Sequence, residues 1–310
     1  MNRNELISQI QKLKEDKNAV VLAHYYQNGD IQDVADFVGD SLGLSIEAKK
    51  TTADIIVFAG VQFMAETAKI LNPTKKVLLP DLNAGCSLAD SCTPELFQMV
   101  KKKFPNHTVV TYVNCSAEIK AMSDIVCTSS NALKVVESIP IGQPILFAPD
   151  KNLGAYIVKK TGRKMELWNG SCVVHEAFSL DKLIELRLKY PKSKIVAHPE
   201  SEEQILKYAD FIGSTSEMKS YIINSDREVF IVATEEGILH GLRKEVSQKT
   251  LIPAPIYEDN NCACGECAYM KVNTLQKLYE CMLHESPEIQ ISEELIQKAV
   301  VPIEKMLAIK

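Results

Sequence analysis

The sequence lacks the features that would direct a chain into or across a membrane. No apolar run approaches the ~20 residues that a membrane-spanning helix needs. Residues 1–20 follow the pattern of a polar amphipathic helix and contain neither the apolar core nor the cleavage site of a signal peptide. Basic residues form no long block and the net charge is −5, so neither nucleic acid nor a membrane is an expected partner. We therefore expect a cytoplasmic protein.

Low-complexity tracts are also absent, and the composition is that of a globular chain. The 310 residues are 46% hydrophobic and 24% charged, which suits two or more domains. The nine cysteines are an odd number in a reducing compartment, so disulfides are not the expected use. Unpaired cysteines are commonly buried as small apolar residues. We interpret four of them as packing residues: Cys92, Cys115, Cys127 and Cys281.

Three apolar segments resemble one another at a nearly constant spacing. They are VVLAHYYQ from Val20, TVVTYVNC from Thr108 and KIVAHPES from Lys194, and they place His24, Tyr112 and His198 at equivalent positions, 88 and 86 residues apart. A second set, DFVGDS, DIVCTS and DFIGST, keeps the same spacing, and a third and a fourth set follow. Val- and Ile-rich runs of this kind are typical of buried parallel strands. The chain therefore contains a threefold internal repeat.

Helical patterns separate these strands, so each repeat alternates strands with helices. Such alternation with right-handed crossovers predicts a three-layer α/β/α unit with a parallel four-stranded sheet. We expect an α/β fold of three similar domains related by a pseudo-threefold axis around a central active site. The expected limits are residues 1–88 for an N-terminal helix and repeat 1, 89–175 for repeat 2, and 176–310 for repeat 3 with an extended cysteine loop and C-terminal helices.

Ligands bind at the carboxyl ends of strands in open parallel sheets, and the unusual residues fall there. The hydroxyl residues Ser41, Ser129 and Thr215 follow the second strands and precede helices. Each hydroxyl alone is best explained as a helix N-cap, but three equivalent hydroxyls favour an anion site, because helix N-termini attract anions. His175, close to Cys172, is only a weak candidate.

One cysteine per repeat follows the fourth strand, namely Cys86, Cys172 and Cys267. Three thiolates could hold zinc with a water ligand, or a [4Fe–4S] cluster with one open iron that acts as a Lewis acid. The run Cys262, Cys264 and Cys267 alone resembles a local zinc site. Spacing does not separate these alternatives.

Several longer motifs resemble the quinolinate synthase A family. They are AHYYQNGDIQDVADFVGDSLGLS from Ala23, NAGCSLAD from Asn83, TYVNCSAEIKA from Thr111, WNGSCVVHEAF from Trp168, VAHPES from Val196 and CAYMKVNTLQKL from Cys267. The resemblance spans residues 19–283 and implies an enzyme with a three-cysteine [4Fe–4S] cluster. Such an enzyme condenses iminoaspartate with dihydroxyacetone phosphate and dehydrates the product to quinolinate, with release of phosphate, in de novo NAD synthesis. One departure is Ala268, where members often have proline.

The resemblance also implies roles for single residues. The cluster ligands would be Cys86, Cys172 and Cys267. The substrate-binding residues would be His24, Ser41, Tyr112, Asn114, Ser129, His198, Glu200 and Thr215. Proton transfer would involve Tyr26, Glu200, His24 and His198. The family also implies a transient contact with an aspartate-oxidising enzyme that supplies the unstable iminoaspartate.

Two alternatives to this enzyme use the cysteine run at 262–267. One is a zinc-stabilised binding protein, and the other is a thiol-redox protein. Cys262 and Cys264 have no assigned role, since they could form a redox-sensitive pair or be inert loop cysteines.

Overall fold

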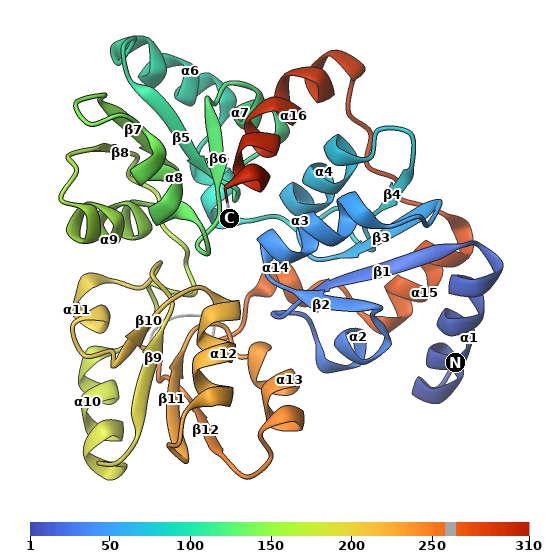
Figure 1. Ribbon diagram of the computed structural model, residues 1–310. Helices are drawn as coiled ribbons and strands as arrows, with labels where there is room; N and C mark the ends of the chain where they lie inside the picture. The colour runs from blue at the N-terminus through green and yellow to red at the C-terminus, as the bar shows by residue number, and fades with distance from the viewer. Residues whose placement is uncertain (258–264, 310) are drawn as a thin grey trace.

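The computed structural model describes residues 1–257 and 265–309, which form three parallel four-stranded sheets arranged around a common centre (Figure 1). The first sheet contains β1 (Ala19–His24), β2 (Phe37–Gly39), β3 (Ile55–Ala59) and β4 (Lys76–Leu78). The second contains β5 (Thr108–Tyr112), β6 (Ile125–Cys127), β7 (Ile145–Ala148) and β8 (Glu166–Leu167). The third contains β9 (Lys194–Ala197), β10 (Phe211–Ile212), β11 (Val229–Ala233) and β12 (Thr250–Pro253). The predicted α/β class with three similar units is confirmed.

The three sheets share one strand order, in which the first strand of each repeat lies between the second and the third. The orders are β2-β1-β3-β4, β6-β5-β7-β8 and β10-β9-β11-β12. Every residue of β3 and β7 is buried, because helices cover both faces of the sheets. The four sets of repeated segments in the sequence therefore correspond to the four strands of each sheet.

An aspartate at the start of each second strand explains one of the repeated motifs. The carboxylates of Asp36, Asp124 and Asp210 accept hydrogen bonds of 2.7–2.8 Å from a backbone N–H of the first strand in their own repeat. The backbone N–H of each aspartate donates to the carbonyl of that same strand residue at 2.8–3.0 Å. This reciprocal pairing fixes the register of the neighbouring strands, which accounts for the residue type at this position.

Helices fill the connections between the strands. The first unit has α1 (Arg3–Asp16), α2 (Gly29–Val34), α3 (Ser41–Lys50) and α4 (Gln62–Leu71). The second has α5 (Ser87–Ser91), α6 (Pro94–Lys103), α7 (Ala117–Ala121), α8 (Ala132–Ser138) and α9 (Lys151–Thr161). The third has α10 (Leu180–Lys189), α11 (Glu203–Leu206), α12 (Thr215–Asn224) and α13 (Ile238–Glu245). The chain ends with α14 (Ala268–Lys271), α15 (Leu275–His284) and α16 (Glu293–Ala308).

The last two helices leave the third unit and return to the other two. Helix α15 packs against α1, where Leu275 and Leu278 join the apolar cluster of Leu6 and Ile10. Helix α16 lies beside α7 and β6, and the chain ends near the centre of the molecule (Figure 1). The three units are thus tied together by the C-terminal segment, and the domain limits drawn from the repeats stay a prediction.

The four cysteines interpreted as packing residues are buried. Cys92 and Cys115 belong to one apolar cluster, Cys127 to a second and Cys281 to a third, each at most 2% exposed. These side chains fill the core of the units, as their neutral thiols allow. Separately, no helix within the described residues combines the length and apolar character needed to cross a membrane.

Candidate functional site

A cavity lies where the carboxyl edges of the three sheets meet. Residues from all three units line it, and every site residue expected from the sequence is among them. These residues are His24, Tyr26, Ser41, Cys86, Tyr112, Asn114, Ser129, Cys172, His198, Glu200, Thr215 and Cys267. The fold thus gathers side chains that are almost 250 residues apart in the sequence, while their individual roles stay predictions.

Two histidines occupy equivalent positions after the first strands of units one and three, and they are held in the same way. The backbone N–H of Tyr26 donates to Nδ1 of His24 at 3.2 Å, and that of Glu200 donates to Nδ1 of His198 at 3.4 Å. Burial lowers the pKa of His24 to about 4 and that of His198 to about 3. Both rings are therefore neutral at physiological pH, with the proton on Nε2 available for donation.

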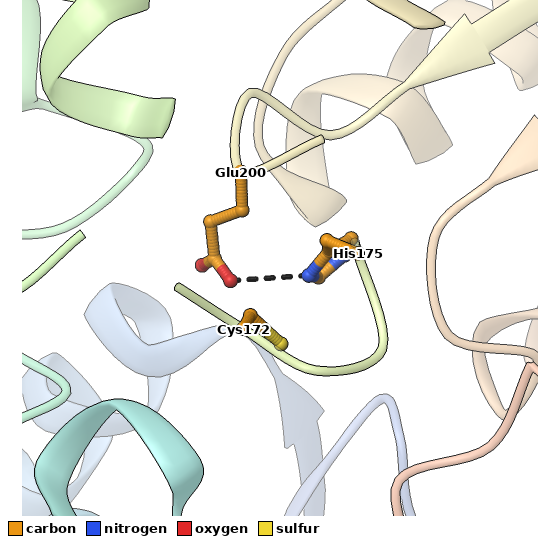
Figure 2. A group of neighbouring side chains, drawn as sticks. All are labelled: Cys172, His175 and Glu200. Carbon is orange, nitrogen blue, oxygen red and sulfur yellow. Dashed lines mark ion pairs between the residues drawn. The ribbon is translucent and has the colours of Figure 1, made fainter. Parts of the chain in front are cut away.

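The carboxylate of Glu200 is the centre of a buried polar group. The Tyr112 hydroxyl donates to its Oε1, and its Oε2 lies 3.1 Å from Nδ1 of His175 (Figure 2). Burial by itself raises the pKa of Glu200. The electrostatic effect of His175 and His198, together with hydrogen bonding to His175 and Tyr112, outweighs burial and lowers the pKa. We infer that Glu200 is an ionised carboxylate at neutral pH.

A chain of side-chain contacts joins Glu200 to Tyr26. Nε2 of His175 lies 2.9 Å from Oγ1 of Thr234, and that oxygen lies 2.6 Å from the hydroxyl of Tyr26. Burial raises the pKa of the Tyr26 phenol well above its usual value. A phenol in this state gives up its proton only to a nearby base, and the threonine, imidazole and carboxylate form the kind of oriented relay that supplies one.

Two residues in this series of contacts were not identified as site residues from the sequence. Thr234 was not a candidate at all, and His175 was only a weak one. Thr234 follows β11 at the position that Gly60 and Pro149 occupy in the other two repeats, so the repeat gives no signal for it. His175 lies three residues after Cys172, where a histidine has no counterpart in the other units. Their roles become visible only when the three units are placed against one another.

Three thiols enter the cavity from separate parts of the chain. Cys86 precedes α5 and Cys267 precedes α14, each as the N-cap residue, and Cys172 follows β8. Burial raises the pKa of Cys86 to about 12 and that of Cys267 to about 11, and the pKa of Cys172 lies well above its usual value. The thiols also raise one another's pKa. Burial therefore favours the neutral thiols, and a bound cation would favour their ionisation.

The spread of the possible ligands helps to distinguish a single ion from a larger metal centre. Cys172, His175 and Glu200 bring one ligand atom each to within 4.8 Å of one another (Figure 2). Among the residues that the structure describes, the three thiols form no such group. Sulfurs bound to one zinc ion lie roughly 3.8 Å apart, from Zn–S bonds of ~2.3 Å in a tetrahedron. The three thiols as a set therefore fit a wider centre than one zinc ion.

The three hydroxyl residues are not the caps of their helices, which corrects one of the interpretations of the sequence. Asp40 caps α3 through a 2.8 Å bond from Gly43 N–H, and Ser214 caps α12 in a capping box with Glu217. The N-cap residue of α8 is Asn131. Ser41, Ser129 and Thr215 lie within two residues of these capping residues and line the cavity.

Two further acidic residues shape the cavity wall. Asp40 also accepts a 2.8 Å hydrogen bond from the hydroxyl of Ser130 and so joins units one and two. Glu235, directly after Thr234, is buried, and burial raises its pKa while Lys271 and backbone N–H donors oppose that rise. Cys262 and Cys264, for which no role was expected or excluded, lie outside the described residues.

Comparison with known proteins identifies relatives along nearly the whole chain. Residues 8–308 match the sequence model of a family described as Quinolinate synthetase A protein. The chain is 60% identical over 304 residues to the quinolinate synthase of Microcystis aeruginosa, covering 98% of this chain and 95% of that protein. It is 59% identical over 303 residues to the quinolinate synthase of Gloeothece citriformis, with 98% and 93% covered. It is 58% identical over 306 residues to that of Cyanophora paradoxa, with 99% and 92% covered.

Proposed function

Because this chain belongs to the quinolinate synthetase A family of enzymes, we propose that it condenses iminoaspartate with dihydroxyacetone phosphate and dehydrates the product to quinolinate. Phosphate and water are the other products, and the reaction serves NAD biosynthesis. The observation that carries this proposal is the central cavity, where three thiols, a buried acid–base chain and hydroxyl groups beside helix N-termini come together.

We propose that Cys86, Cys172 and Cys267 hold a [4Fe–4S] cluster and leave one iron without a protein ligand. Three thiols from separate parts of the chain line one cavity, and their spread supports a centre larger than one ion. When bound, such a cluster supplies a Lewis acid that polarises a substrate oxygen. The zinc-stabilised and thiol-redox alternatives both rest on the run at 262–267 and leave Cys86 and Cys172 without a role.

The substrates carry carboxylates and a phosphate, and the cavity wall offers donors for these anions. Ser41 and Thr215 are the first residues of α3 and α12, where free N–H groups and the helix dipole favour negative charge. Ser129 has the equivalent position in the sequence repeat and lies three residues before α8 begins. Asn114 adds a buried Oδ1 atom that has no hydrogen-bond partner within the described part of the chain. A buried oxygen of this kind is suited to accept an N–H or O–H of a bound substrate.

Proton transfer falls to the groups around Glu200. Tyr26 can pass its proton through Thr234 to His175, because Glu200 beside His175 stabilises the imidazolium that results. His24 and His198 stay neutral and present Nε2–H donors, which can stabilise negative charge on a substrate oxygen. The two histidines thus donate hydrogen bonds to the substrate, while the contacts from Tyr26 to Glu200 carry out proton abstraction.

Iminoaspartate hydrolyses in water, so we propose that an aspartate-oxidising enzyme supplies it through a transient contact. The surface of this chain that such a partner would use is not assigned, and the cytoplasmic location stays a prediction.

The function is tested by purifying the protein without oxygen and assaying it with iminoaspartate generated in situ and dihydroxyacetone phosphate. We expect a brown protein with about four irons per chain and quinolinate formation that is lost when air destroys the cluster. A colourless protein that contains zinc and forms no quinolinate would contradict the proposal and favour the zinc-stabilised alternative. Turnover that persists with no iron bound would refute the cofactor assignment.

Replacing Ser129 by alanine is expected to raise the KM for one or both substrates about tenfold, because one hydrogen bond to a charged group is lost. The iron content should not change, since Ser129 is not a thiol ligand. Ser138→Ala in the same unit is the matched control, because Ser138 lies at the end of α8 and its hydroxyl donates to the carbonyl of Val135. Steady-state kinetics of both variants check this, and an unaltered KM for both substrates would remove Ser129 from the anion site.

A further inference from the structure

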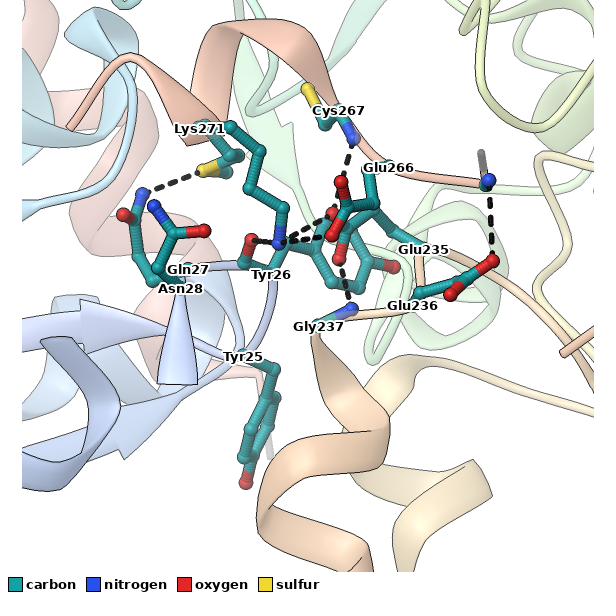
Figure 3. A network of polar contacts seen from close by, with 12 residues as sticks. Tyr25, Tyr26, Gln27, Asn28, Glu235, Glu236, Gly237, Glu266, Cys267 and Lys271 are labelled. Carbon is teal, nitrogen blue, oxygen red and sulfur yellow. Dashed lines mark hydrogen bonds and ion pairs between the residues drawn. The ribbon is translucent and has the colours of Figure 1, made fainter. Parts of the chain in front are cut away.

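A buried carboxylate, that of Glu235, accepts hydrogen bonds from two backbone segments, and one of them carries the third thiol. Its Oε1 accepts a 3.1 Å hydrogen bond from the N–H of Cys267, and its Oε2 accepts a 2.7 Å bond from the N–H of Gly237 (Figure 3). The side chain is 1% exposed, so the charge has little access to water. Its partner is Lys271, whose Nζ lies 3.1 Å from Oε1.

The ammonium group of Lys271 makes a second contact, with the first unit. Its Nζ donates to the carbonyl oxygen of Tyr26 at 2.9 Å, and Figure 3 shows it between that carbonyl and the Glu235 carboxylate. Lys271 ends helix α14, one turn after Cys267, so the same short helix carries both residues. Lys271 therefore connects the segment of the third thiol to the segment of Tyr26.

Tyr26 is consequently held at both ends by neighbouring parts of the third unit. Its carbonyl contacts Lys271, and its hydroxyl contacts Thr234, the residue directly before Glu235. The two segments approach so closely that a Cβ atom on Gly237 would lie 2.8 Å from backbone atoms of Tyr26. The amide of Gln32 adds hydrogen bonds of 2.8–3.0 Å to the carbonyls of Tyr25, Gln27 and Gly237. A shift of either segment therefore moves the other.

We propose that the Glu235–Lys271 ion pair positions two parts of the active site at once, by coupling the seating of Cys267 to the placement of Tyr26. This inference rests on the proposed function, in which Cys267 is a cluster ligand and Tyr26 transfers a proton. Both residues act through the groups that they hold. A buried ion pair costs desolvation free energy and is weak evidence for stability alone, whereas groups that orient metal ligands have large effects on metal retention and activity.

The central variant is Lys271→Met, which keeps most of the length of the side chain and removes its charge. It leaves Glu235 without its cation and the Tyr26 carbonyl without its donor. We expect a chelator to remove the cluster at least about tenfold faster and kcat to fall about tenfold at equal iron content, with little change in KM. Lys271→Arg should restore most of both, because a guanidinium can donate to a carboxylate and a carbonyl together.

Lys249→Met is the matched control within the third unit. Nζ of Lys249 is partly buried and donates to the carbonyls of Ile222 and Ser225 at 2.5 and 2.6 Å, away from the residues that line the cavity. This variant also loses a lysine that ties backbone segments together, so it should unfold at a lower temperature. Its cluster retention and kcat per iron should equal those of the wild type.

The double variant Glu235→Met/Lys271→Met separates positioning from stability. Removing both charges eliminates the penalty of an unpaired buried carboxylate, so the thermal midpoint should recover relative to Lys271→Met. Cluster retention and kcat should not recover, because the carbonyl of Tyr26 still lacks its donor and the N–H of Cys267 has now also lost its acceptor. Recovery of all three quantities would overturn the proposal, as would wild-type retention and turnover in Lys271→Met.

A measurement on the cluster-free protein keeps this inference separate from the proposed function. In that state, a maleimide should label Cys267 faster in Lys271→Met than in the wild type, while the labelling of Cys86 stays the same. Peptide mass mapping gives both rates. If the wild type makes no quinolinate, the proposed function fails while the labelling result still tests the positioning role. Equal labelling rates in the two proteins would refute that role. If Lys271→Met does not fold, Lys271→Gln provides the same comparison, since it loses the charge and the reach.

Discussion

Replacing Cys86 by serine is expected to abolish the bound cluster and to lower kcat at least about a thousandfold, since metal-ion catalysis contributes several kcal/mol to the barrier. The serine hydroxyl is a hard, weakly acidic ligand and does not substitute for a thiolate on iron. Iron and sulfide analysis, visible absorption and steady-state kinetics on anaerobic protein measure the effect. Cys281→Ala is the matched control, because Cys281 is buried in an apolar cluster beside α1 and should leave both quantities unchanged.

The Cys86→Ser variant distinguishes the proposed enzyme from its alternatives, because Cys86 is 176 positions before the run at 262–267. A zinc site or redox pair built within that run would not depend on a cysteine from the first unit. The proposed enzyme would depend on it fully, since each of the three thiols would be one ligand of the same cluster. A Cys86→Ser protein with wild-type turnover would therefore refute the three-cysteine assignment.

Glu200→Gln is expected to lower kcat about 10²- to 10⁴-fold, the range for loss of a general acid–base group. The amide cannot stabilise an imidazolium at His175, so the proton of Tyr26 loses its acceptor. Because Glu200 is not a thiol ligand, the iron content should remain that of the wild type. Kinetics on protein of known iron content test this, and an enzyme that keeps both its cluster and full turnover would exclude the role.

Two comparisons sharpen this second prediction. Glu203→Gln is the control, because the Glu203 side chain is 64% exposed and pairs with Lys159 and Lys207 at the surface. Tyr26→Phe should lower kcat to a similar extent, and the double variant with Glu200→Gln should be little worse than either single one. Groups that act as one chain show such non-additive losses. If the loss of kcat in the double variant equals the product of the two single losses, Tyr26 and Glu200 act in separate steps.

The repeats in the sequence were sufficient to predict the sheets and the residues at their edges. Buried parallel strands have a recognisable apolar composition, and a constant offset between repeats removes the ambiguity of any one run. The same offset placed His24, Tyr112 and His198 at equivalent strand ends, and the structure brings them to one cavity. It also marked Asp36, Asp124 and Asp210, whose shared hydrogen bonds to the neighbouring strand explain why the residue type recurs.

Contacts between the units could not be predicted in this way. Thr234, Glu235 and Lys271 matter because the third unit and the C-terminal segment touch Tyr26, and no repeat encodes a contact between different repeats. The helix caps were misplaced by one or two residues, because Ser, Asp and Asn all serve as N-caps and the sequence offered several candidates side by side. Local patterns define each unit, whereas the site depends on how the units are joined.

The return of α15 to the first unit and of α16 to the second has a consequence for biosynthesis. A ribosome synthesises a chain from its N-terminus, and domains generally fold as they emerge. Here the apolar faces beneath Leu278 and Ile303 stay uncovered until α15 and α16 have been made. The first two units therefore complete their folding only after α15 and α16 have emerged. Cys267, the last of the three thiols in the chain, is made just before these two helices, so the proposed cluster would find its three ligands together only late in synthesis.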